Sequence, residues 1–144
     1  MVSYMNFNET DIRNTYKFLA HDKQTEMRLI NPKTYARKVI HVDNEEDFVR
    51  VCKEHNGQYN IYAGINERSI GGTEAKHVKS VKTIVIDIDP RRSTGTASTN
   101  KELDNAHRVA CQIEYDMLNM GFEQPRMAMS GNGCQLGLLY QKLE

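Results

Sequence analysis

The stretch Val81–Pro90 reads Val-Lys-Thr-Ile-Val-Ile-Asp-Ile-Asp-Pro, and it has the clearest structural pattern in the chain. Its β-branched residues predict a strand, and Pro90 ends that strand because proline cannot donate a hydrogen bond to a sheet. Side chains alternate along a strand, so Asp87 and Asp89 are expected on one face, ~7 Å apart, with the isoleucines on the other. We expect this stretch to be the central strand of the fold.

Two neighbouring carboxylates at the end of an apolar strand repel each other, and burial makes the repulsion more costly. A Mg²⁺ or Mn²⁺ ion relieves it, since these ions favour oxygen ligands and often bind one or two protein carboxylates plus substrate phosphates. Asp87 and Asp89 are therefore candidate metal ligands and catalytic residues. The alternative is that both side chains are solvated at the strand end or cap the following turn.

The composition narrows the class of protein. The chain has 144 residues, enough for one domain with a real core, and its 19 basic and 19 acidic residues balance. No global field therefore draws it to nucleic acid or to a membrane. Its three cysteines lie far apart, and no signal peptide or apolar span is present, so we expect reduced thiols in a cytoplasmic protein without membrane contact. We expect a single domain over residues 1–144, with residues 143–144 resembling a cloning scar.

Three helices are predicted from their capping residues. Asn8 is a suitable first N-cap, and Asp43 with Glu46 resembles the capping box of a second helix. Thr99 with Glu102 forms a third box, followed by apolar residues at helical spacing.

Four further strands are predicted from apolar or aromatic character, over Thr25–Ile30, Tyr59–Ile65, Arg126–Ser130 and Cys134–Tyr140. Gly121 is expected just after the third helix, as its C′ residue. The mixed order of helices and strands predicts an α+β domain, with helices packed on a mixed or antiparallel sheet.

A second motif, Ser130-Gly131-Asn132-Gly133, joins the last two predicted strands and continues into Cys-Gln-Leu. Glycines let backbone amides approach an anion closely, and consecutive amides in such a turn can form an anion-binding nest. The alternative is a plain hairpin turn, for which the same glycines have the required backbone freedom.

The two motifs, separated by one long helix, resemble the archaeo-eukaryotic primase superfamily, in particular the primase-polymerase domains of plasmid and phage replication proteins. In that family a hydrophobic-Asp-hydrophobic-Asp strand supplies two metal ligands, which Asp87 and Asp89 match. A later Ser-Gly-x-Gly-x-His turn holds the nucleotide's phosphates, and Ser130, Gly131 and Gly133 match it. The resemblance covers nearly the whole chain and implies a catalytic domain with an RRM-like core.

The sequence departs from the family pattern in two respects. Gln135 stands where the family usually has histidine, and glutamine can donate a hydrogen bond but cannot act as an acid. The family also uses a third acidic residue on a later strand, which falls beyond residue 144. We therefore expect this chain to be the N-terminal part of such a domain, with incomplete metal coordination and weak or no activity by itself.

The resemblance implies metal-dependent, template-directed nucleotide transfer in DNA replication, with Mg²⁺ or Mn²⁺ as the cofactor. The implied partners are a nucleoside triphosphate, a single-stranded DNA template, and helicase or initiator segments of a longer parent chain. Asn132 and Gln135 are expected at the phosphates, and Arg68 and Arg91 are candidate nucleotide or phosphate contacts. The alternative for the two arginines is solvation or pairing with a nearby glutamate.

Two other functions fit parts of the pattern. A catalytically degenerate DNA- or nucleotide-binding module of a replication initiator would explain Gln135 and the neutral charge. A metal-dependent glycosyltransferase also uses Asp-x-Asp, but there the motif usually follows parallel strands, and the glycine turn has no evident role.

Overall fold

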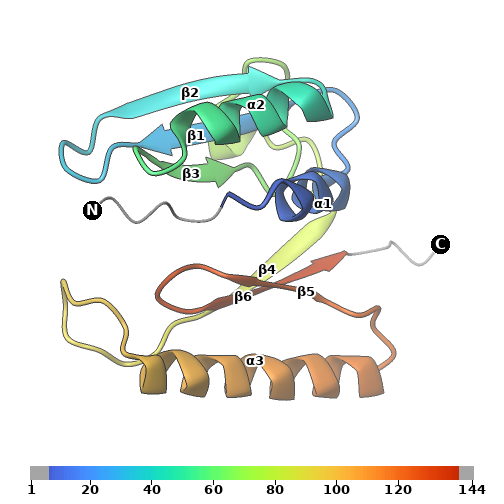
Figure 1. Cartoon of the computed structure of the whole chain (residues 1–144). Helices are drawn as coiled ribbons and strands as arrows, with labels where there is room; N and C mark the ends of the chain where they lie inside the picture. The colour runs from blue at the N-terminus through green and yellow to red at the C-terminus, as the bar shows by residue number, and fades with distance from the viewer. Residues whose placement is uncertain (1–6, 140–144) are drawn as a thin grey trace. The chain divides into compact units, whose positions relative to one another are not determined.

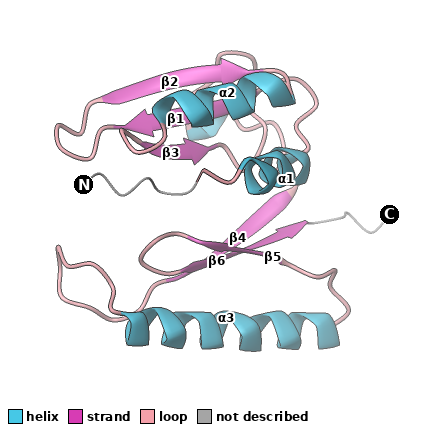
Figure 2. Cartoon of the chain, viewed as in Figure 1, coloured by secondary structure: helices cyan, strands magenta, loops and turns pink. Residues whose placement is uncertain are grey.

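The computed structural model describes residues 7–139, and the chain divides into two compact units, residues 1–81 and 82–144 (Figure 1). The first unit combines several helices, and the second one helix, with a three-stranded antiparallel sheet (Figure 2). This arrangement confirms the α+β class, and both sheets are antiparallel. The sequence predicts one domain over residues 1–144, whereas the structure has two units, each with a core of its own.

The first unit is built on a sheet with the strand order β2-β1-β3. Its elements follow the chain as α1 (Glu9–Leu19), β1 (Thr25–Ile30), β2 (Arg37–Val42), α2 (Glu45–His55), β3 (Asn60–Ala63) and the short 3-10 helix η1 (Ala75–His77). The strand β1 is central and pairs antiparallel with both neighbours. Both α-helices pack on one face of this sheet (Figure 1). The segment that leads into η1 contacts the other face, where Arg28 donates to the Thr73 carbonyl and His41 Nε2 lies 3.4 Å from the Gly72 carbonyl oxygen.

Alternation along β1 separates the core of the first unit from the opposite face of the sheet. Met27 and Leu29 are fully buried and pack with Leu19 of α1 and Phe48 of α2. The side chain between them, Arg28, therefore belongs to the opposite face of the sheet, because successive strand residues point to opposite sides.

Local capping decides where the helices of the first unit begin. The Asn8 side chain accepts a hydrogen bond from the Asp11 amide, so the predicted first cap is confirmed. The second helix begins one residue later than the sequence predicts. Its N-cap is Asn44, which accepts from the Asp47 amide, and not Asp43. Asparagine and aspartate are equally good N-caps, so the sequence pattern does not distinguish Asp43 from Asn44. The path of the chain after β2 decides which of them caps the helix.

The second unit contains β4 (Thr83–Ile88), α3 (Asn100–Asn119), β5 (Arg126–Met129) and β6 (Cys134–Leu139). Its sheet has the order β4-β6-β5, so β6 is central and β4, predicted to be central, lies at an edge. The reason is that β5 and β6 form a hairpin, and β6 pairs with β4 along its other edge.

The helix α3 covers one face of this sheet (Figure 1). Ala106 and Ala110 of α3 pack against Cys134 and Leu136 of β6. Ile86 and Ile88 of β4 pack against the same cluster, whereas Ile84, expected beside them, remains 48% exposed.

Both ends of α3 lie where the sequence predicts them. Thr99 and Glu102 form the predicted capping box, and Gly121 has a φ of +88°, as expected of a C′ glycine. The strands β5 and β6 lie within their predicted ranges, and Tyr140 lies outside the described residues. No helix between residues 7 and 139 combines the length and apolar character that crossing a membrane requires.

Candidate functional site

The register of the second sheet places Asp87 directly opposite Gln135. The two residues are antiparallel partners on β4 and β6, and Ala128 of β5 continues the same row. Cβ atoms of directly opposed residues lie about 4.5–5.5 Å apart. Because Ile86 and Ile88 on either side pack toward α3, Asp87 and Gln135 lie on the helix-free face. The carboxylate of the first motif and the amide of the second are therefore neighbours.

Asp89 meets the second motif at its last glycine. A Cβ placed on Gly133 would lie 2.7 Å from Asp89 Oδ1 and 3.3 Å from Asp89 Cα, and still closer to the carbonyl oxygen of Ile88. Only a residue without a side chain fits against the end of β4 at this position. The Gly133 backbone thus packs directly on the second aspartate, and the two motifs meet at one end of the sheet.

The turn between β5 and β6 is closed by a hydrogen bond from the Ser130 amide to the Gly133 carbonyl, at 2.9 Å. Gly131 has a φ of +91°, in the left-handed region that favours glycine, and a Cβ there would meet open space. The Ser130 amide is therefore engaged within the turn. Ser130 and Gly131 are exposed at its tip.

Asn132 has a structural role that the sequence does not reveal. Its side-chain oxygen accepts a hydrogen bond from the Ser98 amide at 3.1 Å, and its carbonyl accepts one from Ser98 Oγ at 2.7 Å. These two bonds tie the loop that precedes α3 to the glycine turn. Asn132, predicted to contact phosphate, thus uses its acceptor to hold the loop beside the candidate site.

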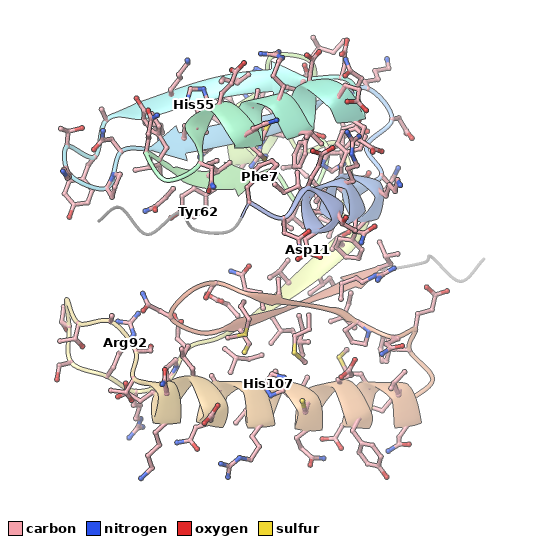
Figure 3. The ribbon with its side chains drawn as sticks, in the orientation of Figure 1. Phe7, Asp11, His55, Tyr62, Arg92 and His107 are labelled. Carbon is pink, nitrogen blue, oxygen red and sulfur yellow. The ribbon has the colours of Figure 1, made fainter. Side chains whose placement is uncertain are left out.

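The two arginines after β4 differ in their surroundings. Arg91 is exposed, whereas Arg92 donates a hydrogen bond from Nη1 to the carbonyl of Thr96 at 3.0 Å, within the loop that leads to α3 (Figure 3). Thr96 also bonds back to the Ser93 carbonyl, so the loop closes on itself. Arg91 is therefore the more exposed arginine of this pair.

Arg68, the other predicted phosphate contact, belongs to the first unit. Its Nη1 lies 3.0 Å from Oε2 of Glu26, whose side chain is only 2% exposed. Its partner is therefore Glu26, which lies far from it in the sequence, and not one of the glutamates nearby in the chain. The structure does not assign Arg68 to the site formed by Asp87 and Gln135.

The donor set at this end of the sheet suits a hard divalent cation with few protein ligands. It consists of two carboxylates, both exposed, with an amide side chain beside one of them. Among residues 7–139, no cluster of three or more His, Cys, Asp or Glu side chains has the geometry of a metal site. Two carboxylates leave most of the coordination sphere to water and phosphate oxygens, as is common for Mg²⁺.

A pocket of about 600 Å³ in the second unit lies elsewhere. Its lining includes His107, Cys111 and Glu114 of α3 together with Arg126 at the start of β5. Cys111 Sγ lies 3.8 Å from His107 Nε2. Asp87 does not line this pocket.

One residue beside the site was not predicted. Ser98 is the loop residue that contacts Asn132. Its type alone carries no signal, since serine in a loop is common. Only the closure of the loop brings it to the glycine turn.

Comparison with known proteins gives no match to this chain among protein-family models, curated proteins or solved structures. The primase resemblance therefore remains an expectation based on the two motifs.

Proposed function

We propose that the second unit holds the metal-bound triphosphate of a nucleotide and serves nucleotidyl transfer of the primase-polymerase type. The observation that carries this proposal is the meeting of the two motifs, with Asp87 opposite Gln135 and Asp89 against Gly133. Residues that lie about 45 positions apart in the sequence thus form one polar end of a sheet. A hairpin with no ligand has no need of this particular pairing.

Each residue has a chemical role in this proposal. Asp87 and Asp89 bind Mg²⁺ or Mn²⁺, which supplies charge neutralisation at the phosphates and activation of the attacking hydroxyl. Gln135 donates a hydrogen bond to a phosphate oxygen, and Gly133 lets the backbone approach. Arg91 supplies a positive charge near the phosphates or the template strand. The clamp through Asn132 keeps the turn and the loop in place.

A binding module without catalysis is the second candidate, and Gln135 favours it. The residue opposite Asp87 carries no titratable group, so this position supplies neither a general acid nor a positive charge. Nucleotide and metal binding would persist in such a protein, while transfer would not. A nucleotide-sugar transferase gains no support, because both partners of β6 run antiparallel to it.

The test is a Mn²⁺ titration of the isotopically labelled chain, with and without a deoxynucleoside triphosphate, followed by paramagnetic broadening of backbone amides. We expect broadening centred on Asp87, Asp89 and the turn at Gly133. Asp87→Asn should reduce Mn²⁺ affinity at least about tenfold, since even the loss of an outer-shell partner costs 10–100-fold. Asp104→Asn, which removes an exposed carboxylate on α3, is the matched control.

The outcomes separate the candidates. Diffuse broadening that Asp87→Asn leaves unchanged would overturn the metal site and both candidates with it. Localised broadening with primer extension on a single-stranded template would support nucleotidyl transfer. Localised broadening without extension, in a protein that still binds the triphosphate, would support the binding module.

A further inference from the structure

The face of the first sheet that lies opposite α1 and α2 carries an aromatic side chain next to an arginine. Arg28 on β1 is the antiparallel partner of Tyr62 on β3, so their Cβ atoms lie about 4.5–5.5 Å apart. Tyr62 is 52% exposed and lies at the surface of the first unit (Figure 3). RNA-binding sheets stack bases on aromatic side chains and arginine planes, and a half-exposed ring beside a guanidinium group offers both kinds of surface.

A buried carboxylate holds two arginines in place at this face. The Glu26 side chain is 2% exposed and forms ion pairs with Arg28 and with Arg68, the latter at 3.0 Å. Arg28 also donates to the Thr73 carbonyl. Two guanidinium groups around one carboxylate leave a net charge of +1. The buried partner also fixes both groups before any ligand arrives, which lowers the entropic cost of binding.

The position of Arg68 depends on a glycine. A Cβ on Gly64 would lie 2.7 Å from Arg68 Nη1, so a side chain at residue 64 would displace the guanidinium group. Within the described residues, Arg68 Nε is buried and has no hydrogen-bond partner. Glu26 Oε2, in the same ion pair, is likewise buried without a hydrogen-bond partner. The Nε–H group is therefore available to an acceptor that enters the pocket.

The pocket itself has a volume of about 430 Å³, within the usual range for small-molecule sites. It is lined by Glu26, Arg28, Tyr62, Gly64 and Arg68, with apolar side chains of β1 and β3 alongside. Its lining therefore offers charged donors in a fixed geometry together with a flat aromatic surface.

We infer that this pocket binds a phosphorylated nucleoside, with the phosphate on the two guanidinium groups and the base against the Tyr62 ring. Arginine forks match phosphate geometry, and every base has a face that stacks on an aromatic ring. The ligand is either a free nucleotide or one residue of a single strand, because both present the same phosphate and base. The inference uses residues of the first unit alone and does not depend on the metal site.

The experiment records amide chemical shifts of the full chain in EDTA, so that no divalent ion contributes. Thymidine 5′-monophosphate, a short oligothymidylate and inorganic phosphate are titrated separately. We expect shifts at Tyr62, Gly64 and Arg68. Tyr62→Leu keeps an apolar strand residue and should weaken binding about 5- to 100-fold through the loss of stacking. Tyr115→Leu, which removes an exposed tyrosine from α3, should leave affinity unchanged.

The three ligands distinguish a free nucleotide from a single strand and define the results that would refute the inference. Shifts in this pocket with the monophosphate support a free nucleotide, and shifts with the oligonucleotide alone support a single strand. If inorganic phosphate competes equally and Tyr62→Leu binds normally, the nucleoside class is refuted. If none of the three ligands shifts these amides, the cluster is a structural ion-pair network only. Neither failure bears on the Mn²⁺ titration, which reports on Asp87 and Asp89.

Discussion

Replacing Gly133 with alanine tests the contact that joins the two motifs. The added methyl group would lie 2.7 Å from Asp89 Oδ1, whereas ordinary contact begins at 3.4 Å, so the carboxylate must move by at least about 0.7 Å. The carboxylate can rotate, but the Ile88 carbonyl lies closer still and belongs to the backbone at the end of β4. Overpacking of this kind costs about 1–3 kcal/mol, and one lost ladder hydrogen bond adds about 0.5–1.5 kcal/mol. We therefore expect Gly133→Ala to lower the free energy of unfolding by about 2–4 kcal/mol.

Gly131→Ala is the matched control in the same turn. Its methyl group would meet open space, and its cost is the strain of an L-residue at a φ of +91°, about 1–2 kcal/mol. Urea denaturation of the two variants and the parent chain measures both effects, and Mn²⁺ broadening reports whether Asp89 has moved. Gly133→Ala should be the less stable variant and the one with weaker Mn²⁺ binding. A Gly133→Ala protein within about 0.5 kcal/mol of the parent would refute the close packing of the turn on β4.

Three further predictions concern the second unit's cap, the thiols and the loop clamp. Hydrogen bonds from the Thr99 backbone and side chain hold the pKa of Glu102 below its ordinary value of 4.5, so the cap's contribution is present above that pH and is lost as the pH falls through the lower, folded-state pKa. Thr99→Ala keeps the backbone donor and removes the hydroxyl, so it should raise that pKa part of the way toward 4.5 in a carboxyl NMR titration and cost about 1 kcal/mol in urea. An unchanged pKa would contradict the hydrogen bond from the Thr99 hydroxyl. Burial raises the pKa of Cys52 to about 11, so a thiol reagent followed by peptide mapping should label exposed Cys111 first, and equal rates would contradict the burial. Asn132→Ala should speed amide exchange in the loop before α3 and cost about 1 kcal/mol, whereas unchanged exchange would mean that the clamp does not hold the loop.

Most of the helices and strands were predictable because their signals are local. Asn8 and Thr99 cap their helices as expected, since a cap depends on a few neighbouring residues. The missed strand was β2, over Arg37–Val42, whose sequence Arg-Lys-Val-Ile-His-Val begins with two exposed basic residues. It becomes a strand through its pairing with β1, which is a tertiary contact.

The candidate site, too, was predictable only where its features are local. The sequence by itself determined that Asp87 lies near the end of an apolar strand and that a glycine turn joins two later strands, because period-two alternation and turn chemistry are local properties. The tertiary structure alone decided that Asp87 faces Gln135, that Gly133 packs on Asp89, and that β4 is an edge strand. Register and strand order depend on how segments far apart in the chain pair and pack, and no window of sequence contains that information.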